Sequence, residues 1–341
     1  MSEHPPIQSI GVQSIGVLGA GAWGTALAQV AARAGRDVKL WTRSPDLAVG
    51  MNARRENVDY LPGVALHKSI TPTGDMRDLS NCDAIFSVAP AQHTRATLNR
   101  FAPHAKQGVP VVICSKGFER DTVKLMTDVL TEELPTARAA VLSGPSFAVD
   151  AGAGLPVAVT LACAEAPLGR ALVEAIGQPS FRPYLSDDLV GAAIGGAVKN
   201  VLAIVCGVVE GRRLGKSAHA AVLTRGFAEM TRLAVAMGAK PATLTGLSGF
   251  GDLVLTCSSP QSRNMSLGFA LGQGRKLGQI LSERKSVTEG VATAPAVVKL
   301  ADRHVVNMPI CRAIAAVLAD KISVSEAIDG LLNRPFTVEM G

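Results

Sequence analysis

The sequence around Lys199 gives the most direct indication of proton-transfer chemistry. Residues 195–205 are apolar apart from this lysine and Asn200. Burial disfavours the charged form of an amine, so a lysine enclosed there has its pKa lowered from about 10.4 toward neutrality and becomes able to donate and accept protons. The alternative is a side chain that reaches solvent from an ordinary amphipathic helix.

Other polar residues of interest follow later in the chain. Asp252 comes directly after the glycine-rich residues 246–251, where a helix N-cap is the simpler interpretation. Ser262, Arg263 and Asn264 are consecutive. Arg263 offers a planar fork that binds phosphate through two parallel hydrogen bonds, and an exposed loop arginine is the alternative.

Three glycines, Gly19, Gly21 and Gly24, form a G-x-G-x-x-G pattern directly after the apolar residues 14–18. The pattern permits a tight turn, close approach of a pyrophosphate to the backbone and close packing of a helix on a strand. The N–H groups at the helix N-terminus attract phosphate. The position between a predicted strand and a predicted amphipathic helix favours a dinucleotide-binding loop over a glycine-rich turn without a ligand.

The end of the second predicted strand bears on which dinucleotide is bound. An NAD-selective site normally has Asp or Glu there, about 20 residues beyond the glycines. This chain instead has Arg43 and no carboxylate in residues 40–44. We therefore expect NADP to bind, the alternative being that Arg43 is a solvated loop residue.

Polar residues also follow two later apolar runs. Lys116 comes after the run at residues 110–115, and Gly144 and Ser146 follow the run at residues 139–142. Parallel strands present their carboxyl ends at one edge, so these residues are candidates for ligand contacts, with ordinary loop chemistry as the alternative. The sequence after Gly144 lacks the last glycine of a G-x-S-x-G nucleophile elbow and shows no clear following helix, which disfavours a hydrolase.

The order of apolar runs predicts an α/β first half and a helical second half. Short Val/Ile/Leu-rich runs separated by crossover-length segments are typical of a doubly wound parallel sheet buried on both faces. The predicted strands are residues 14–18, 37–41, 84–88, 110–115, 139–142 and 156–161, and the predicted helices are residues 190–209, 218–237, 291–303 and 310–319, with a capping box at Ser323 and Glu326 for a last helix. We expect a flexible leader at residues 1–13, a Rossmann-type dinucleotide-binding domain at 14–188 and an all-α substrate and catalytic domain at 189–341.

The composition narrows the class of protein. A chain of 341 residues with 48% hydrophobic residues has material for about two domains. Its net charge of +6 is scattered, which disfavours nucleic-acid binding and favours small anions, with a solvated basic surface as an equally good alternative. The six separated cysteines are expected to be buried free thiols, and the histidine spacing predicts no metal site. Residues 191–211 are long enough to span a membrane, but Lys199 favours a buried helix instead.

Taken together, these motifs resemble NAD(P)-dependent glycerol-3-phosphate dehydrogenase of the bacterial type, over about residues 14–332. The matching blocks are GAGAWGTALA at 19–28, SKGFE at 115–119, LSGPSFA at 142–148, GGAVKNVLAI at 195–204, LTRGFAEMTRL at 223–233, GLSGFGDLVLTC at 246–257, SRN at 262–264 and EG at 289–290. The chain departs from the family at residues 211–219, which carry arginines and a lysine in place of a Gly- and Asn-rich loop, and at residues 87–93.

The resemblance implies an activity and a set of site residues. It implies reversible reduction of dihydroxyacetone phosphate to sn-glycerol 3-phosphate with NADH or NADPH, which supplies phospholipid synthesis, with Lys199 as acid/base. We further expect Asp252 to orient Lys199 and balance its charge. The resemblance implies substrate contacts at Lys116, Gly144, Ser146, Lys199, Asp252, Ser262, Arg263 and Asn264. It implies cofactor contacts at Gly19, Gly21, Ala22, Trp23, Gly24, Arg43, Lys116, Ala148, Arg263, Val287 and Glu289.

Asn200 and Thr256 are further polar groups that we expect to support Lys199. The family expectation is a homodimer, and the absence of an apolar, positively flanked leader predicts a cytoplasmic protein. Competing interpretations are a related NADP-dependent hydroxyacid dehydrogenase, a nonenzymatic NAD(P)-binding sensor that lost turnover, and a basic binder of nucleic acid or membrane surfaces, which would need clustered charge.

Overall fold

The computed structural model of the protein describes residues 11–284, 288–336 and 338. Their contacts form two compact units. The sheet unit contains residues up to 89, 93–115 and 126–192, and the helical unit contains residues 90–92, 116–125 and those from 193 onward. The predicted domain boundary at 188/189 stays a prediction, and the first ten residues of the expected leader lie outside the described residues.

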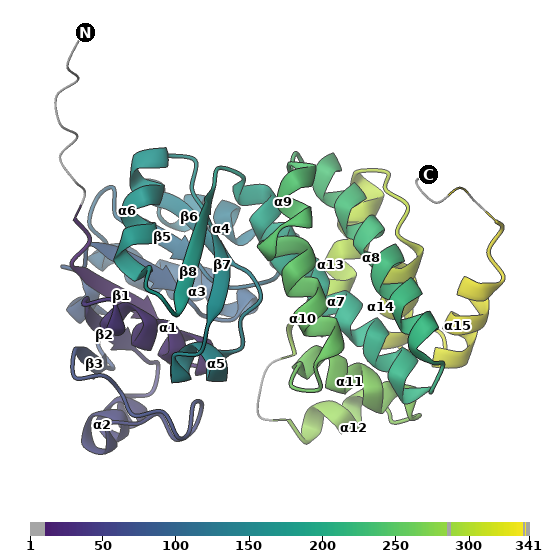
Figure 1. Ribbon diagram of the computed structural model, residues 1–341, viewed down its shortest axis with the longest axis horizontal. Helices are drawn as coiled ribbons and strands as arrows, with labels where there is room; N and C mark the ends of the chain where they lie inside the picture. The colour runs from purple at the N-terminus through teal and green to yellow at the C-terminus, as the bar shows by residue number, and fades with distance from the viewer. Residues whose placement is uncertain (1–10, 285–287, 337, 339–341) are drawn as a thin grey trace, which may run out of the picture. The chain divides into compact units, whose positions relative to one another are not determined.

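One sheet of eight strands organises the sheet unit (Figure 1). Its strands are β1 (Ser14–Leu18), β2 (Asp37–Trp41), β3 (Ile70–Thr73), β4 (Ala84–Ser87), β5 (Pro110–Ile113), β6 (Arg138–Ser143), β7 (Val157–Ala162) and β8 (Phe181–Ser186). Their spatial order is β3-β2-β1-β4-β5-β6-β7-β8. The chain moves from β1 outward to β3 and then from β4 outward to β8, so the strand order reverses between β1 and β4. Open α/β sheets bind ligands at this kind of switch point.

The strands found from the sequence are those whose apolar residues are mostly buried. Ile15, Val17 and Leu18 of β1 are fully buried, and both β1 and β2 have the predicted bounds. Strands β3 and β8 were missed because they lie at the two edges and read ITPT and FRPYLS, each with a proline. Proline and polar residues are tolerated at edges, where the apolar pattern is weakest.

The expectation of a parallel sheet is wrong at one pair, because β7 runs antiparallel to β6. A parallel connection has to carry the chain back along the full length of a strand. The helix between these strands, α5 (Ala148–Ala153), has only six residues. At 1.5 Å per residue it covers about 9 Å, against about 20 Å for a six-residue strand, so it is too short to serve as a full crossover helix.

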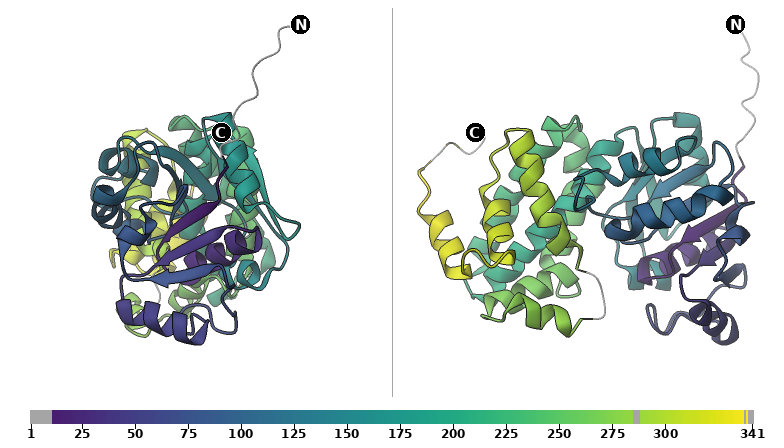
Figure 2. Two further views of the ribbon diagram at one scale, coloured as in Figure 1. Left: turned by 90° about the vertical axis from the view of Figure 1, so that its left-hand side faces the viewer. Right: turned by 180° about the vertical axis from the view of Figure 1, so that it is seen from behind.

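Helices cover both faces of the sheet, which confirms the doubly wound α/β prediction. One face carries α1 (Ala22–Arg33), α5 and α6 (Ala166–Ile176), and the other carries α3 (Ala91–Phe101) and α4 (Met126–Glu133), seen from behind in Figure 2. The remaining elements are α2 (Pro45–Arg54) and the 3₁₀ helices η1 (Met76–Leu79) and η2 (Ala102–His104). The apolar residues buried between the sheet and α1, α5 and α6 form a core cluster of this unit.

The helical unit is built around α7 (Leu189–Gly211). Its other helices are α8 (Lys216–Ala236), α9 (Pro241–Thr245), the π-helical turn η3 (Leu247–Gly251), α10 (Asp252–Ser258), α11 (Arg263–Gly272), α12 (Leu277–Ser282), α13 (Glu289–Arg303), α14 (Pro309–Leu318) and α15 (Val324–Leu332). The four predicted helices correspond to α7, α8, α13 and α14, and Ser323 and Glu326 form the predicted capping box of α15. Helices α9, α10 and α12, of 5, 7 and 6 residues, escaped the sequence reading because each is too short for a clear period, and α11 was not predicted either.

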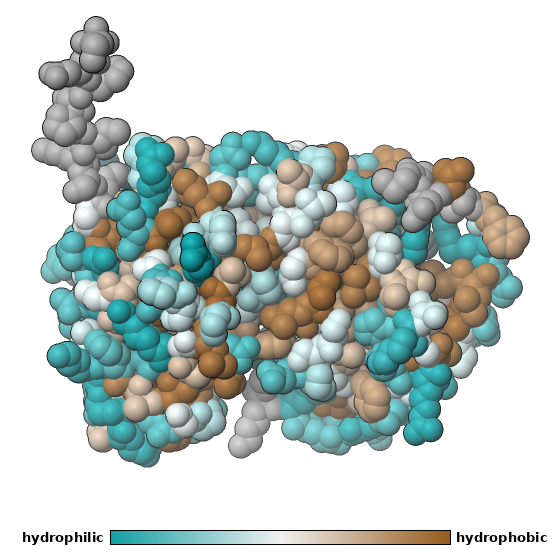
Figure 3. All heavy atoms as spheres, in the orientation of Figure 1, coloured by the Kyte–Doolittle hydropathy of each residue, from teal (hydrophilic) through white to brown (hydrophobic). Residues whose placement is uncertain are grey.

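Helix α7 is long and apolar enough to cross a membrane, but 94% of its most apolar window is buried inside the protein. The prediction of a buried core helix is therefore confirmed. The surface in Figure 3 mixes hydrophilic and hydrophobic side chains over both units. All six cysteines are free and buried, as predicted.

Glycines allow α11 to pack directly on α7. A Cβ added at Gly268 would lie 1.9 Å from the Ile204 carbonyl oxygen, and one added at Gly207 would lie 2.0 Å from the Met265 carbonyl oxygen. Both distances are far below van der Waals contact, so only glycine fits at these positions. The close approach brings the first turn of α11 against the part of α7 that follows Lys199.

Candidate functional site

Lys199 lies in the middle of α7 with its side chain only 7% exposed. Its Nζ donates hydrogen bonds to Asp252 Oδ1 and, over 2.9 Å, to Thr256 Oγ1. Asp252 and Thr256 are four residues apart on α10 and therefore share one helix face. Of the two alternatives that the sequence left open for Lys199, the side chain that reaches solvent is excluded.

The carboxylate of Asp252 joins two lysines. Its Oδ2 accepts a hydrogen bond of 2.8 Å from Lys116 Nζ, while Oδ1 accepts from Lys199. The Asp252 side chain is 1% exposed, and that of Lys116 is 17% exposed. A buried carboxylate is tolerated only when charge and hydrogen bonds compensate it, and two ammonium groups provide both.

The N-cap interpretation of Asp252 is wrong. The N-cap of α10 is Gly251, and the Asp252 side chain makes no capping hydrogen bond. The π-helical turn η3 continues into α10 without an extended N-cap residue, because Gly251 itself has helical dihedral angles. The carboxylate is thereby left for the two lysines.

The environment shifts the protonation equilibrium of Lys199. Burial is the largest effect and lowers the pKa of Lys199 to about 7, the charge of Asp252 opposes that change, and the positive charge of Lys116 adds to it. At neutral pH the amine is therefore present in both protonation states. A group of this kind both donates and accepts a proton without a large energetic cost.

A chain of buried amides fixes the elements around this pair. Asn200 Nδ2 donates to the Lys116 carbonyl over 3.2 Å, and Asn200 Oδ1 accepts from Asn264 Nδ2 over 2.9 Å. Asn264 Oδ1 in turn accepts from Gly290 N over 3.0 Å. These bonds connect the segment 116–125, α7, α11 and α13. Asn200, expected beside the Lys199 amine, instead holds the Lys116 backbone.

Glu289, the first residue of α13, places a buried acceptor in the same unit. Its Oε1 accepts from Ala91 N over 3.3 Å, and its Oε2 is buried with no hydrogen-bond partner among the described residues. Burial raises the pKa of Glu289. An unpaired buried acceptor is costly, and a polar group of a ligand would relieve that cost. Val287, also predicted at the cofactor, lies outside the described residues.

The first turn of α11 carries the predicted phosphate-binding residues. Ser262 is buried and is the N-cap of α11, where its Oγ accepts from Met265 N over 3.2 Å. Arg263 follows as the first helical residue and is exposed. The positive charge of Arg263 lowers the pKa of Glu289, but burial raises it and is the larger effect.

In the sheet unit, the three predicted glycines form the turn between β1 and α1. Gly19 has a φ of 124°, and a Cβ there would lie 3.2 Å from Ala89 N, just after β4. A Cβ on Gly24 would lie 1.8 Å from the Gly19 carbonyl oxygen, whereas Gly21 is exposed with no atom within 4 Å of its Cβ position. The turn is therefore packed on its inner side and open at Gly21, at the switch point of the sheet. Ala22 and Trp23 begin α1, whose N-terminal N–H groups attract phosphate.

This arrangement fits the pyrophosphate of a dinucleotide. The backbone approaches an outside group at Gly21 without a side chain in the way, and the dipole of α1 favours negative charge there. The expectation of NAD or NADP as cofactor rests on this turn and, as described below, on the family.

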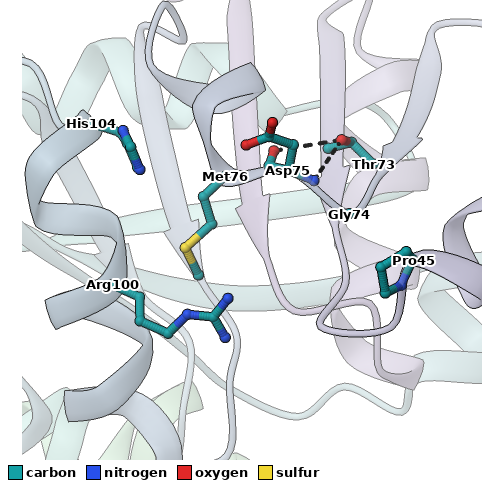
Figure 4. Close-up of a pocket in the computed structure, with 7 residues that line it drawn as sticks. All are labelled: Pro45, Thr73, Gly74, Asp75, Met76, Arg100 and His104. Carbon is teal, nitrogen blue, oxygen red and sulfur yellow. Dashed lines mark hydrogen bonds between the residues drawn. The ribbon is translucent and has the colours of Figure 1, made fainter.

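Arg43 is exposed directly after β2, between Thr42 and the α2 N-cap Ser44. A cavity of about 580 Å³ opens beside α2, and Figure 4 shows its lining residues. They are Pro45, Thr73, Gly74, Asp75, Met76, Arg100 and His104. No predicted site residue lines this cavity.

Three further predicted residues follow β6. Gly144 has a φ of 150°, and a Cβ there would lie 2.8 Å from Val159 Cα, so this position requires glycine. Ser146 Oγ donates to the Gly144 carbonyl over 3.1 Å, and Ala148 begins α5. A short helix therefore does follow this turn, contrary to the sequence reading, but the Ser146 hydroxyl is bound to its own loop.

Sequence reasoning missed Asn57 and Gln29 in the sheet unit. Both are buried polar residues, with exposures of 0% and 2%. Neither belongs to a motif, and only the tertiary structure shows that they are enclosed.

Models of protein families match both halves of the chain. The N-terminal model of NAD-dependent glycerol-3-phosphate dehydrogenase matches residues 14–168, and the C-terminal model matches residues 188–329. Curated relatives named glycerol-3-phosphate dehydrogenase [NAD(P)+] include that of Maricaulis maris, 62% identical over 96% of this chain and 98% of the relative. That of Caulobacter vibrioides is 61% identical over 96% of this chain and 99% of the relative.

Solved structures agree. The crystal structure of glycerol-3-phosphate dehydrogenase from Coxiella burnetii superimposes with a TM-score of 0.91 at 36% identity, covering 95% of this chain and all of that one. The motifs, the two-unit fold, the buried lysine site and these similarities agree. The chain belongs to the NAD-dependent glycerol-3-phosphate dehydrogenase family.

Proposed function

We propose that this protein catalyses the reversible reduction of dihydroxyacetone phosphate to sn-glycerol 3-phosphate with NADH or NADPH, with Lys199 as the proton donor. The observation that carries the proposal is the buried Lys199 amine on the Asp252 carboxylate, with its pKa lowered to about 7. The family and the glycine turn support the cofactor. The product places the enzyme in the supply of backbones for glycerophospholipids.

A reduced nicotinamide held by these residues would supply the hydride for the substrate carbonyl carbon. In reduction, protonated Lys199 gives the Nζ proton to the developing alkoxide oxygen and becomes neutral. In oxidation, neutral Lys199 takes the proton of the hydroxyl group. Asp252 and Thr256 keep Nζ in place by their hydrogen bonds, so the amine does not have to reorient during the transfer.

We assign the remaining predicted residues as the family resemblance implies. Gly19, Gly21, Ala22, Trp23, Gly24 and Arg43 of the sheet unit hold the dinucleotide, together with Lys116, Ala148, Arg263, Val287 and Glu289. Lys116, Gly144, Ser146, Ser262, Arg263 and Asn264 contact the substrate. Support comes from the open glycine turn and from the unpaired Oε2 of Glu289.

Three organisational proposals accompany this assignment. We propose a homodimer in the cytoplasm, on the strength of the family resemblance. We also propose a division into a dinucleotide-binding domain at residues 14–188 and a catalytic domain at 189–341. Sedimentation velocity tests the homodimer. A peak at the monomer mass over the working concentration range contradicts it.

The direct test follows the absorbance of the reduced cofactor. Purified protein is incubated with dihydroxyacetone phosphate and either NADH or NADPH, with free dihydroxyacetone as the control substrate. Turnover that requires the phosphate supports the proposal. Protein that binds NAD(P)H but turns over neither cofactor contradicts it and points to a related hydroxyacid substrate or a sensor.

Arg263→Ala tests recognition of the phosphate. We expect kcat/KM for dihydroxyacetone phosphate to fall by about 10- to 100-fold, because a charge-assisted fork to a dianion is lost. Turnover of free dihydroxyacetone, measured in the same assay, is expected to change little. Arg284→Ala is the matched control, since Arg284 binds the Arg263 carbonyl over 2.7 Å and its loss removes a nearby positive charge without removing the Arg263 side chain. Equal losses toward both substrates in Arg263→Ala exclude a phosphate-binding role.

Arg43→Ala tests the choice between the two cofactors. Loss of a charged partner for the 2′-phosphate is expected to raise the Kd of NADPH by about 10-fold and to leave that of NADH unchanged. Fluorescence titration of the reduced cofactors gives both constants. Arg54→Ala, an arginine in the last turn of α2, serves as the control for a general change in surface charge. An unchanged ratio of the two constants in Arg43→Ala excludes the role.

A further inference from the structure

Asn57 is a completely buried carboxamide in the connection between α2 and β3. Its Nδ2 donates to the carbonyl oxygen of Ala20 over 2.9 Å and to Thr25 Oγ1 over 2.8 Å. Because a carbonyl oxygen only accepts, the NH₂ group of Asn57 has to face Ala20. Asn57 thus binds the glycine turn and the first turns of α1 at the same time.

The bond to Ala20 has a consequence on the other side of its peptide group. A trans peptide is planar, and its C=O and N–H point in opposite directions. The Ala20 carbonyl belongs to the same peptide plane as the Gly21 N–H. Holding the carbonyl toward the interior therefore directs the Gly21 N–H away from Asn57. Gly21 is exposed, with no atom within 4 Å of its Cβ position.

A second buried amide fixes the segment that carries Asn57. Gln29, one turn after Thr25 on α1, donates to the Ala65 carbonyl over 2.6 Å and accepts from His67 N over 2.8 Å. Gln29 is 2% exposed, and among the described residues neither of these side-chain hydrogen bonds reaches the glycine turn. Of the two buried amides between α1 and this segment, only Asn57 reaches the backbone of residues 19–21.

The carbonyl oxygen of the Asn57 side chain argues against a role in packing alone. Oδ1 is buried with no hydrogen-bond partner among the described residues. An unpaired buried acceptor destabilises the folded protein, and an apolar side chain would fill the same space without that cost. The contribution of the carboxamide therefore lies in its two donated hydrogen bonds.

We propose that Asn57 is a positioning residue for the cofactor, which aims the Gly21 N–H at the pyrophosphate before the dinucleotide binds. The inference rests on the cofactor site of the proposed function. It assigns Asn57 no contact with the dinucleotide itself. Its effect is to keep the donor in its binding orientation, which lowers the entropic cost of binding.

The test is the affinity of the purified protein for NADH and NADPH without substrate, by fluorescence titration. Asn57→Ala is expected to raise both Kd values by about 10-fold, because the loop loses the bond that orients its donor. Thr25→Ala, which removes only the second acceptor of Asn57, is expected to raise them less. At saturating cofactor, kcat of both variants is expected to match the wild type, since Lys199 is untouched.

Gln29→Ala is the matched control, because it removes a buried amide that holds the same segment. We expect it to lower the Tm comparably while leaving both Kd values within about twofold of the wild type. An unchanged Kd in Asn57→Ala, or an equal rise in Gln29→Ala, overturns the proposal. If Asn57→Ala does not fold, the Kd values of Thr25→Ala are compared with those of Gln29→Ala instead. An unchanged Kd in Thr25→Ala, or an equal rise in both variants, then overturns the proposal. If the wild-type protein binds neither cofactor, the proposed cofactor site itself is wrong. This outcome distinguishes a failure of the proposed function from a failure of the Asn57 proposal alone.

Discussion

Replacing Lys199 with alanine is expected to lower kcat for dihydroxyacetone phosphate reduction by about 10²- to 10⁴-fold, the usual contribution of a general acid. The reason is geometric and electrostatic. Nζ is buried on Asp252 and Thr256, and burial brings its pKa to about 7. Removal of the amine leaves an alkoxide without a nearby donor. Steady-state kinetics with saturating cofactor measures the effect.

Two controls separate chemistry from folding. Lys199→Arg keeps a positive charge beside Asp252 but does not release its proton near neutral pH, so we expect it to be nearly as inactive. Thr256→Val removes only the neutral hydrogen bond to Nζ and is expected to cost about 10-fold or less. A loss of less than about threefold in Lys199→Ala contradicts the assignment, since an acid/base residue contributes far more.

The pH dependence of the wild type follows from the same group. Reduction requires protonated Lys199, so kcat/KM in that direction is expected to be constant below a pH near 7 and to fall above it. Oxidation requires the neutral amine and is expected to rise through the same pH and then level off. Lys199→Arg is expected to lose this transition. Parallel profiles in the two directions would contradict a shared acid/base.

Replacing Asp252 with asparagine is expected to have the second-largest effect. The carboxylate raises the pKa of Lys199 against the effect of burial, so its loss lowers that pKa further. Less of the protonated amine then remains at neutral pH. The falling limb of the reduction profile should move to lower pH, and kcat at pH 7.5 should drop by about 10- to 10³-fold as both the charge and the orienting bond are lost.

The same substitution is expected to destabilise the protein. Breaking a buried ion pair costs about 3–5 kcal/mol when a charge is left uncompensated, and deprotonation of Lys199 reduces that cost. Denaturant unfolding measures it. Asp302→Asn is the matched control, because Asp302 pairs with Arg312 over 2.6 Å but its side chain is 60% exposed. Surface pairs contribute little. A stable Asp252→Asn protein with an unshifted pH profile would rule out the proposed coupling.

The sequence reading succeeded where one local pattern determines the structure. Strands β1 and β2 were predicted to the residue, because each has a short cluster of buried apolar residues bounded by polar or turn-forming residues. The turn at Gly19 was identified because its three glycines keep a fixed short spacing directly after an apolar run and before an amphipathic segment. Edge strands β3 and β8 and the antiparallel pairing of β7 depend on neighbours in space, and no local pattern reports them.

By itself, the sequence determined the doubly wound class, the dinucleotide turn, the family and the residues Lys199 and Asp252 as candidates, since each has a short-range pattern of residue types. Only the tertiary structure decided what those residues contact. It excluded a capping role for Asp252, brought Lys116 to its second oxygen and moved Asn200 from the amine to the Lys116 backbone. It also revealed Asn57 beneath the glycine turn. The physical reason is that burial and pairing of polar groups depend on atoms far apart in the chain, and these set pKa values and orientation.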